Sequence, residues 1–227
     1  EKFDYGTLRE RLREIAFLNK GLRIELSFND RKDLFFYPDG IMEFIDYINK
    51  DKNPIGKIIY FEESRNDVQL EVAMQYNGGY SENIYAFVNS INTIEGGTHI
   101  SGFRSALTRV LNDYGRNGVL KNGDGSLSGD DAREGLSALI SLKMKDPQFD
   151  GQTKTRLGNS EIRGIVESIM ADKLSTFLLE NPDVAGQIMK KVTGALRARM
   201  AAKRARELTR KKDGSETFAL SGKLAPC

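Results

Sequence analysis

The sequence predicts an α+β fold in which a few strands are followed by long helices. Apolar and polar residues alternate between 22 and 28, which is typical of a half-buried strand. Apolar residues recur at helical spacing over 41–49 and 99–114. Because strands and helices come in separate runs, α+β is favoured over a fold of repeated βαβ units.

The first fifty residues predict two helices and two strands. A helix is expected over 7–20 and ends near Gly21, since glycine is common just after a helix. The alternating strand over 22–28 follows, and Asn29-Asp30 makes a turn. A short strand over 33–37 precedes the helix over 41–49.

Three strands are expected next, over 57–62, 67–76 and 82–91. Asn77-Gly78-Gly79 lies between the last two, and Asn and Gly tolerate the positive φ values of tight turns. We therefore expect a hairpin there. A helix over 99–114 follows.

The second half predicts a loop, a strand and two helices. Residues 115–129 are rich in Gly, Asn and Ser and are expected to form an exposed loop. Asp130-Asp131 can cap a helical turn before a strand over 136–144. Helices are then expected over 160–180 and 183–211, and the second is so long that part of it should project from the domain.

Composition limits the classes of function. Apolar residues make up 39% of the 227 residues and charged residues 29%, as in a folded domain. One Cys and one His exclude an internal disulfide and the usual zinc ligand sets, so no metal site is expected. We expect a reducing, cytoplasmic location and no membrane span, because no apolar run approaches the ~18 residues required. The chain starts without Met, and we expect it to be part of a longer polypeptide.

The charge is unevenly distributed. Residues 190–212 contain ten basic residues and one acidic residue, a net charge of +9, whereas the whole chain carries +2. Such asymmetry indicates an anionic partner, and the absence of aromatic residues there favours contact with a nucleic-acid backbone over base stacking. The alternative is a solvated helix face. The candidates for contact with nucleic acid are Arg197, Arg199, Lys203, Arg204, Arg206 and Arg210.

Two glycine-rich segments invite ligand-binding interpretations. Residues 122–131 resemble a calcium loop but lack the Glu required at its last position, so calcium binding is not expected. Residues 95–99, EGGTH, match neither common phosphate-binding glycine pattern. We interpret them as a strand-to-helix turn in which glycines permit close approach, Thr98 caps the helix and His99 is a structural hydrogen-bonding residue.

Gln152-Thr153-Lys154 lies on a short polar loop between the strand ending near 144 and the helix starting at 160. A lysine offers three donors and a compact charge, which suits a terminal phosphate. The alternative is a solvated loop lysine. Neither a Ser-His-Asp arrangement nor a paired carboxylate couple is visible, so the residues alone indicate no independent active site.

Several segments together carry a family resemblance. In chain order they are LRERLREIAFLN, PDGIMEFIDYIN, SENIYAFVNSINTIEGGTHISGFRSALTRVLNDY, GDDAREGLSALISLKMKDPQFDGQTKTRLGN, ARARMAAKRARELTRKK and SGKLAPC. The chain resembles the transducer region of the ATPase subunits of bacterial type IIA topoisomerases. This family contains the B subunit of DNA gyrase and, as the alternative, the B subunit of topoisomerase IV.

The resemblance implies a mixed sheet with a left-handed βαβ crossover, like a domain of a small ribosomal subunit protein. It also implies four parts. They are the tail of a GHKL-type (histidine-kinase/Hsp90-like) ATP-binding domain at 1–29, the transducer at 30–182, a long basic helix at 183–212 leading toward a toprim domain, and a linker at 213–227. Lys154 would contact the γ-phosphate of ATP as its sensor, and Gln152 would support it.

The intact subunit would use ATP with Mg²⁺ and act on DNA, together with gyrase A and a second copy of gyrase B in a heterotetramer. The ATP-binding core and the toprim domain are missing from this sequence, so the fragment alone is expected to be inactive and to bind no cofactor. Ile94 and Pro226 depart from residues common in the family, and neither touches the expected phosphate contact. The alternative from another class is a non-enzymatic nucleic-acid-binding scaffold.

Overall fold

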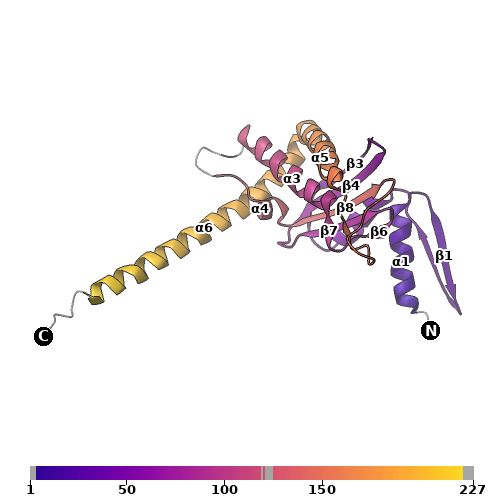
Figure 1. Cartoon of the computed structure of the whole chain (residues 1–227), viewed down its shortest axis with the longest axis horizontal. Helices are drawn as coiled ribbons and strands as arrows, with labels where there is room; N and C mark the ends of the chain where they lie inside the picture. Colours follow the sequence, from indigo (N-terminus) through magenta and orange to yellow (C-terminus); the bar gives the residue numbers. More distant parts are fainter. Residues whose placement is uncertain (1–3, 119, 121–124, 222–227) are drawn as a thin grey trace.

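A five-stranded mixed sheet with helices on both faces forms the body of the molecule (Figure 1). The computed structural model describes residues 4–118, 120 and 125–221, with only the backbone described for 211–221. The strand order is β3-β4-β8-β5-β6. The bounds are β3 Pro54–Arg65, β4 Val68–Asn77, β8 Leu136–Lys143, β5 Asn83–Val88 and β6 Ile91–Asn92.

The predicted hairpin between residues 67–76 and 82–91 is wrong. Strand β8 lies between β4 and β5, pairing antiparallel with β4 and parallel with β5. All but the last residue of β8 is buried, which explains why it takes a central place. The hairpin of this region joins β3 to β4 instead, through Asn66 and Asp67, which both have positive φ.

The connection from β5 to the parallel strand β8 runs through helix α3, Thr98–Arg116, and the short helix α4, Gly129–Arg133. Parallel neighbours need such a crossover connection, and whether it is the transducer-type crossover that the resemblance implies stays a prediction. Its handedness stays a prediction. The loop expected to be exposed at 115–129 is anchored, because Leu127 is buried and its backbone exchanges two hydrogen bonds with the side chain of Asn112.

One face of the sheet is covered by α3, α5 (Ser160–Glu180) and the first half of α6 (Pro182–Ser221). Alternate residues of β4, such as Val72 and Met74, point into this apolar core. Helices α3 and α5 cross closely at Gly102, where a Cβ would lie 2.5 Å from the carbonyl oxygen of Arg163.

Helices α1 (Tyr5–Leu18) and α2 (Ile41–Asn49) cover the other face, with Phe17, Phe44 and Ile45 against the sheet. Strands β1 (Arg23–Phe28) and β2 (Arg31–Phe36) form a separate antiparallel pair beside α1. The domain boundary predicted between residues 29 and 30 falls in the turn that joins β1 to β2, and it stays a prediction. None of the described helices combines the length and apolar character that a membrane crossing requires.

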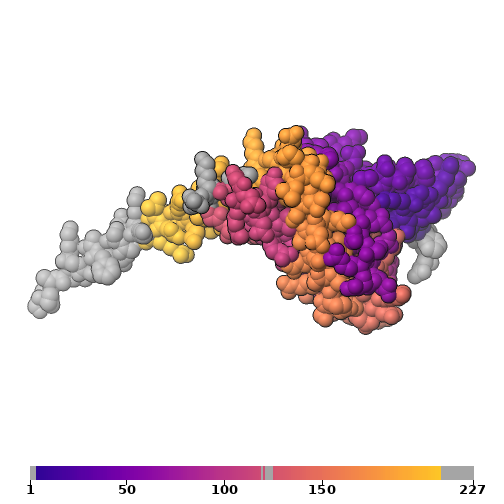
Figure 2. Space-filling model, turned by 90° about the horizontal axis from the view of Figure 1, so that it is seen from above, coloured from indigo at the N-terminus to yellow at the C-terminus, as the bar shows by residue number. Residues whose placement is uncertain are grey.

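Helix α6 starts against the body and then leaves it as an arm (Figures 1 and 2). Leu196 is buried, whereas every residue from 201 to 210 is exposed. The arm agrees with the projection expected from the helix length. The helix backbone continues over 213–221, where a linker was expected, and residues 222–227 lie outside the described part of the chain.

Candidate functional site

Lys154 stands near the tip of the loop that joins β8 to β9 (Arg156–Leu157). Its φ is 54°, in the left-handed region that non-glycine residues rarely adopt, and its backbone N–H donates to the oxygen of Gly151 at 3.4 Å. A lysine held there carries a cost of ~1 kcal/mol or more, so the surrounding structure must impose it. Among the described residues, the side chains of Gln152 and Lys154 have no hydrogen-bond or ion-pair partner, and both are exposed.

The base of this loop is fixed by backbone hydrogen bonds. Strand β9 pairs in parallel with β7, Gly96–Gly97, just before α3. The N–H of Gly158 donates to the oxygen of Gln148 at 2.7 Å, and the N–H of Asp150 donates to the oxygen of Arg156 at 2.9 Å. The tip, residues 151–154, is exposed, and so are Asp150 and Arg156 beside it.

The glycines of the EGGTH segment permit the close approach expected of them. Gly97 has φ 135°, and a Cβ on it would lie 2.4 Å from the carbonyl oxygen of Leu157. The expected cap at Thr98 is wrong. Gly97 occupies the N-cap position without a side-chain bond, and the Thr98 hydroxyl is buried without a partner among the described residues.

His99 is the hydrogen-bonded core residue expected from the sequence. It is fully buried, and its Nε2 lies 3.1 Å from Oγ1 of Thr93. The Thr93 hydroxyl donates to the oxygen of Ala86, so the imidazole Nε2 must be the donor in the shared bond. Burial lowers the pKa of His99 to about 4, and the ring is neutral at pH 7.

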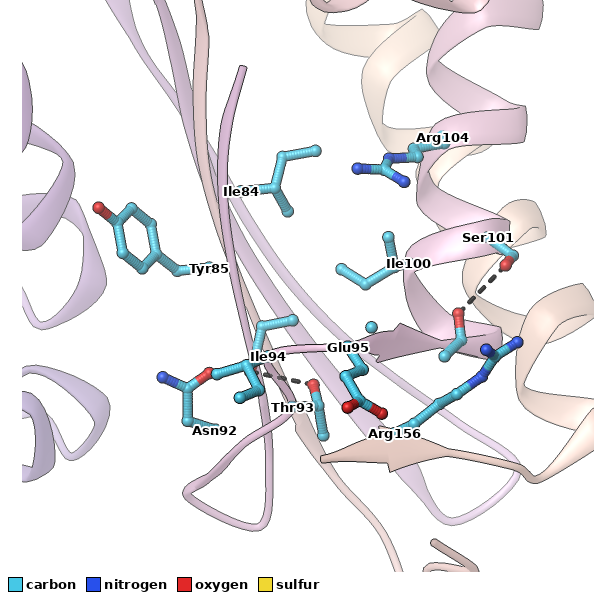
Figure 3. Close-up of a pocket in the computed structure, with 13 residues that line it drawn as sticks. Ile84, Tyr85, Asn92, Thr93, Ile94, Glu95, Ile100, Ser101, Arg104 and Arg156 are labelled. Carbon is cyan, nitrogen blue, oxygen red and sulfur yellow. Dashed lines mark hydrogen bonds between the residues drawn. The ribbon is translucent and has the colours of Figure 1, made fainter. Parts of the chain in front are cut away.

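A cavity of about 570 Å³ opens beside the loop base (Figure 3). Glu95, Arg104 and Arg156 lie on its wall with Ile84 and Ile100. Arg104 pairs with Glu82, and Nε of Arg156 lies 3.3 Å from Oδ2 of Asp150. The positive charges of the two arginines on the cavity wall are therefore paired with carboxylates, in contrast to the charge of Lys154.

The six basic candidates of α6 differ in their surroundings. Arg199 forms a bidentate ion pair with Asp131, with Nε–Oδ1 at 2.9 Å and Nη2–Oδ2 at 2.7 Å. Within the described part of the chain, the other five make no ion pair and are exposed. Arg199 therefore holds α6 to the body, and its charge is largely neutralised by Asp131.

Asp131 also helps to cap helix α4. Ser128, and not Asp130 or Asp131, is the N-cap of α4, and Asp131 completes a capping box by accepting from the N–H of Ser128 at 2.8 Å. Burial alone would raise the pKa of Asp131, but the bonds from Arg199 and Ser128 outweigh burial and lower it. The predicted capping position is off by two to three residues.

No cluster of His, Cys, Asp or Glu in the described ranges could hold a metal ion. Residues 122–124 of the calcium-like loop lie outside those ranges. The sequence did not indicate that Asp131 pairs with Arg199, or that Glu95 bonds Thr155, the residue after Lys154. Each contact joins two segments that are 60 or more residues apart in the chain, so no local sequence pattern could predict it.

Comparison with known proteins identifies the family. Residues 40–208 match the family model described as DNA gyrase B. The DNA gyrase B subunit of Clostridium acetobutylicum is 52% identical over the whole chain, which spans 36% of that protein. The DNA gyrase B subunit of Bacillus mycoides is 50% identical, and the chain spans 57% of that sequence.

Solved structures agree with this result. The 43K ATPase domain of Thermus thermophilus gyrase B, in complex with an aminocoumarin, has a TM-score of 0.82 and 33% identity, covering 92% of this chain and 57% of its own. The topoisomerase IV ATP-binding domain of Francisella tularensis has a TM-score of 0.73 and 27% identity, covering 88% and 55%. The chain therefore spans between about a third and just over half of these relatives, and it belongs to the DNA gyrase B family.

Proposed function

We propose that this chain is the transducer part of the DNA gyrase B subunit, and that it couples ATP binding and hydrolysis to DNA strand passage and supercoiling. The observation that carries the proposal is the loop tip at Lys154. A lysine without a partner among the described residues, in an unfavourable backbone conformation and on a loop with a fixed base, fits a phosphate supplied from outside this chain.

ATP with Mg²⁺ would be held by the preceding ATP-binding domain and would supply a charged terminal phosphate. Lys154 would bind that phosphate as its sensor, and Gln152 would support the contact. When the phosphate is lost, the loop loses its partner, and the two domains are free to rotate. The fragment alone would hydrolyse no ATP, because it contributes one half of the site.

The proposed domain division is that of the sequence analysis, with the tail of the GHKL domain up to residue 29, the transducer over 30–182 and the basic helix leading toward a toprim domain. The crossover would be left-handed. The intact subunit would work in the cytoplasm on DNA, with gyrase A and a second copy of gyrase B. The exposed arginines of the α6 arm would lie near the DNA.

Two other functions can be distinguished from this one. The B subunit of topoisomerase IV would use the same loop, but the quoted gyrase relatives have the higher identities. A nucleic-acid-binding scaffold would depend only on α6 and would have no use for Lys154.

The test is Lys154→Ala in the intact subunit. Loss of one charged contact to a reacting phosphate should lower ATP turnover about 100-fold or more. Lys145→Ala is the matched control, since Lys145 is another exposed lysine between β8 and β9. Its Nζ lies 3.4 Å from Oδ2 of Asp67. Unchanged turnover in Lys154→Ala, or equal losses in both variants, would refute the sensor role.

A further inference from the structure

Lys154 lies between two threonines whose hydroxyl groups form a chain that ends on Glu95. Oγ1 of Thr155 donates to Oε2 of Glu95 at 3.0 Å. Oγ1 of Thr153 lies 3.4 Å from Oγ1 of Thr155. Because the Thr155 hydrogen is used on the carboxylate, Thr153 must be the donor in the second contact.

Glu95 also holds the loop through its backbone. Its N–H donates to the carbonyl oxygen of Thr155 at 3.0 Å, so the same residue contacts both the main chain and the side chain of Thr155. Glu95 directly precedes β7, whose pairing with β9 fixes the other side of the loop base. Figure 3 shows Glu95 and Arg156, the residue after Thr155, on the wall of the same cavity.

We propose that Glu95 is a positioning residue, which acts through Thr155 and Thr153 to fix the direction in which Lys154 leaves the loop. Lys154 sits at φ 54° with one weak backbone bond of its own, so its conformation depends on its two neighbours. Glu95 would not touch the nucleotide. This inference rests on the proposed function of Lys154.

The variants come in pairs that separate the hydrogen bond from general damage. Glu95→Ala removes the acceptor, whereas Glu95→Gln keeps an acceptor oxygen. Thr155→Val removes the hydroxyl donor at nearly constant side-chain shape, whereas Thr155→Ser keeps a hydroxyl donor. Each is made in the intact subunit, and dissociation constants are measured for ADP and for a non-hydrolysable ATP analogue with Mg²⁺.

We expect Glu95→Ala and Thr155→Val to weaken binding of the ATP analogue about fivefold, the effect of losing one hydrogen bond. ADP affinity should stay unchanged, because ADP lacks the phosphate that Lys154 would contact. Glu95→Gln and Thr155→Ser should bind the ATP analogue almost as tightly as the unchanged protein does. Glu95→Ala should add little in a Lys154→Ala background, since both changes remove the same contact.

Lys154→Ala alone separates the two possible failures. If it binds the analogue as the unchanged protein does, the proposed function fails and the role of Glu95 fails with it. If it loses the analogue while Glu95→Ala and Thr155→Val do not, the sensor stands and the positioning role is overturned. Equal weakening of ADP and analogue binding in these two variants would also overturn it.

Discussion

The loop around Lys154 and the outer half of α6 both present basic side chains, but they do so in opposite ways. The loop places one lysine on a base tied by β7–β9 pairing and by Glu95. The arm places its exposed charges on a helix whose residues 201–210 are all exposed and, within the described part of the chain, make no hydrogen bond or ion pair to the body. A single fixed charge suits recognition of one phosphate group, whereas spread charges suit a polyanion without a defined register.

The largest expected effect comes from breaking the loop base. Gly97→Ala would place a Cβ 2.4 Å from the Leu157 carbonyl at φ 135°. The clash and the strained backbone together should lower the free energy of unfolding by about 4 kcal/mol. Gly151→Ala, at φ 78° with open space around it, should cost only about 1 kcal/mol. Urea unfolding of this chain measures both, and equal costs would mean that the β7–β9 contact does not hold the loop.

The next effect comes from breaking the anchor of α6. Arg199→Ala leaves buried Asp131 without its ion-pair partner. Because the Arg199 side chain is 42% exposed, we expect a loss of about 2 kcal/mol, below the usual value for a fully buried pair. Arg197→Ala should stay within about 0.5 kcal/mol of the unchanged protein. Indistinguishable unfolding curves for the two variants would remove the anchor role.

The same ion pair predicts a pH dependence. The pKa of Asp131 is lower in the folded than in the unfolded chain, so its contribution is present above about pH 4 and is lost as the pH falls further. Arg199→Ala should therefore lose less stability than the unchanged protein between about pH 5 and about pH 3. A parallel decline in both proteins would contradict the assignment of this shift to the pair.

The smallest effect sharpens the description of the arm. Replacing Arg204, Arg206 and Arg210 with Gln in the intact subunit should reduce the slope of log affinity for DNA against log salt. The slope should fall by about 0.9 for each phosphate that the arm no longer neutralises. Arg199→Gln should leave the slope unchanged, because its charge is paired with Asp131. A slope change in Arg199→Gln equal to that of Arg204→Gln would contradict the distinction.

Sequence reasoning predicted the fold class and most elements because those depend on local patterns. The helix expected over 160–180 is α5, Ser160–Glu180, and the buried strand over 136–144 is β8 within one residue. The hairpin at residues 77–79 was wrong, because strand order depends on which strand is buried on both faces. Strand β8, which starts at Leu136, has this property, and nothing in residues 77–79 indicates it.

The candidate site was predictable only in part. The polar loop predicted that Lys154 is exposed. The positive φ of Lys154 and the contact of Thr155 with Glu95 depend on tertiary structure, so the sequence did not predict them. The six basic residues of α6 looked equivalent in sequence. Only Arg199 among them pairs with Asp131 in the described part of the chain. The two residues are 68 positions apart in the sequence, so the helical pattern around Arg199 could not predict the pair.

The most direct test of the central claim is the reactivity of Lys154 in the intact subunit. An amine-reactive reagent is applied with Mg²⁺ and either a non-hydrolysable ATP analogue or ADP, and modification is followed by mass spectrometry with Lys145 as the internal reference. We predict that Lys154 is protected by the ATP analogue and not by ADP, while Lys145 reacts equally in both. Equal modification of Lys154 with the two nucleotides would contradict its role as the phosphate sensor.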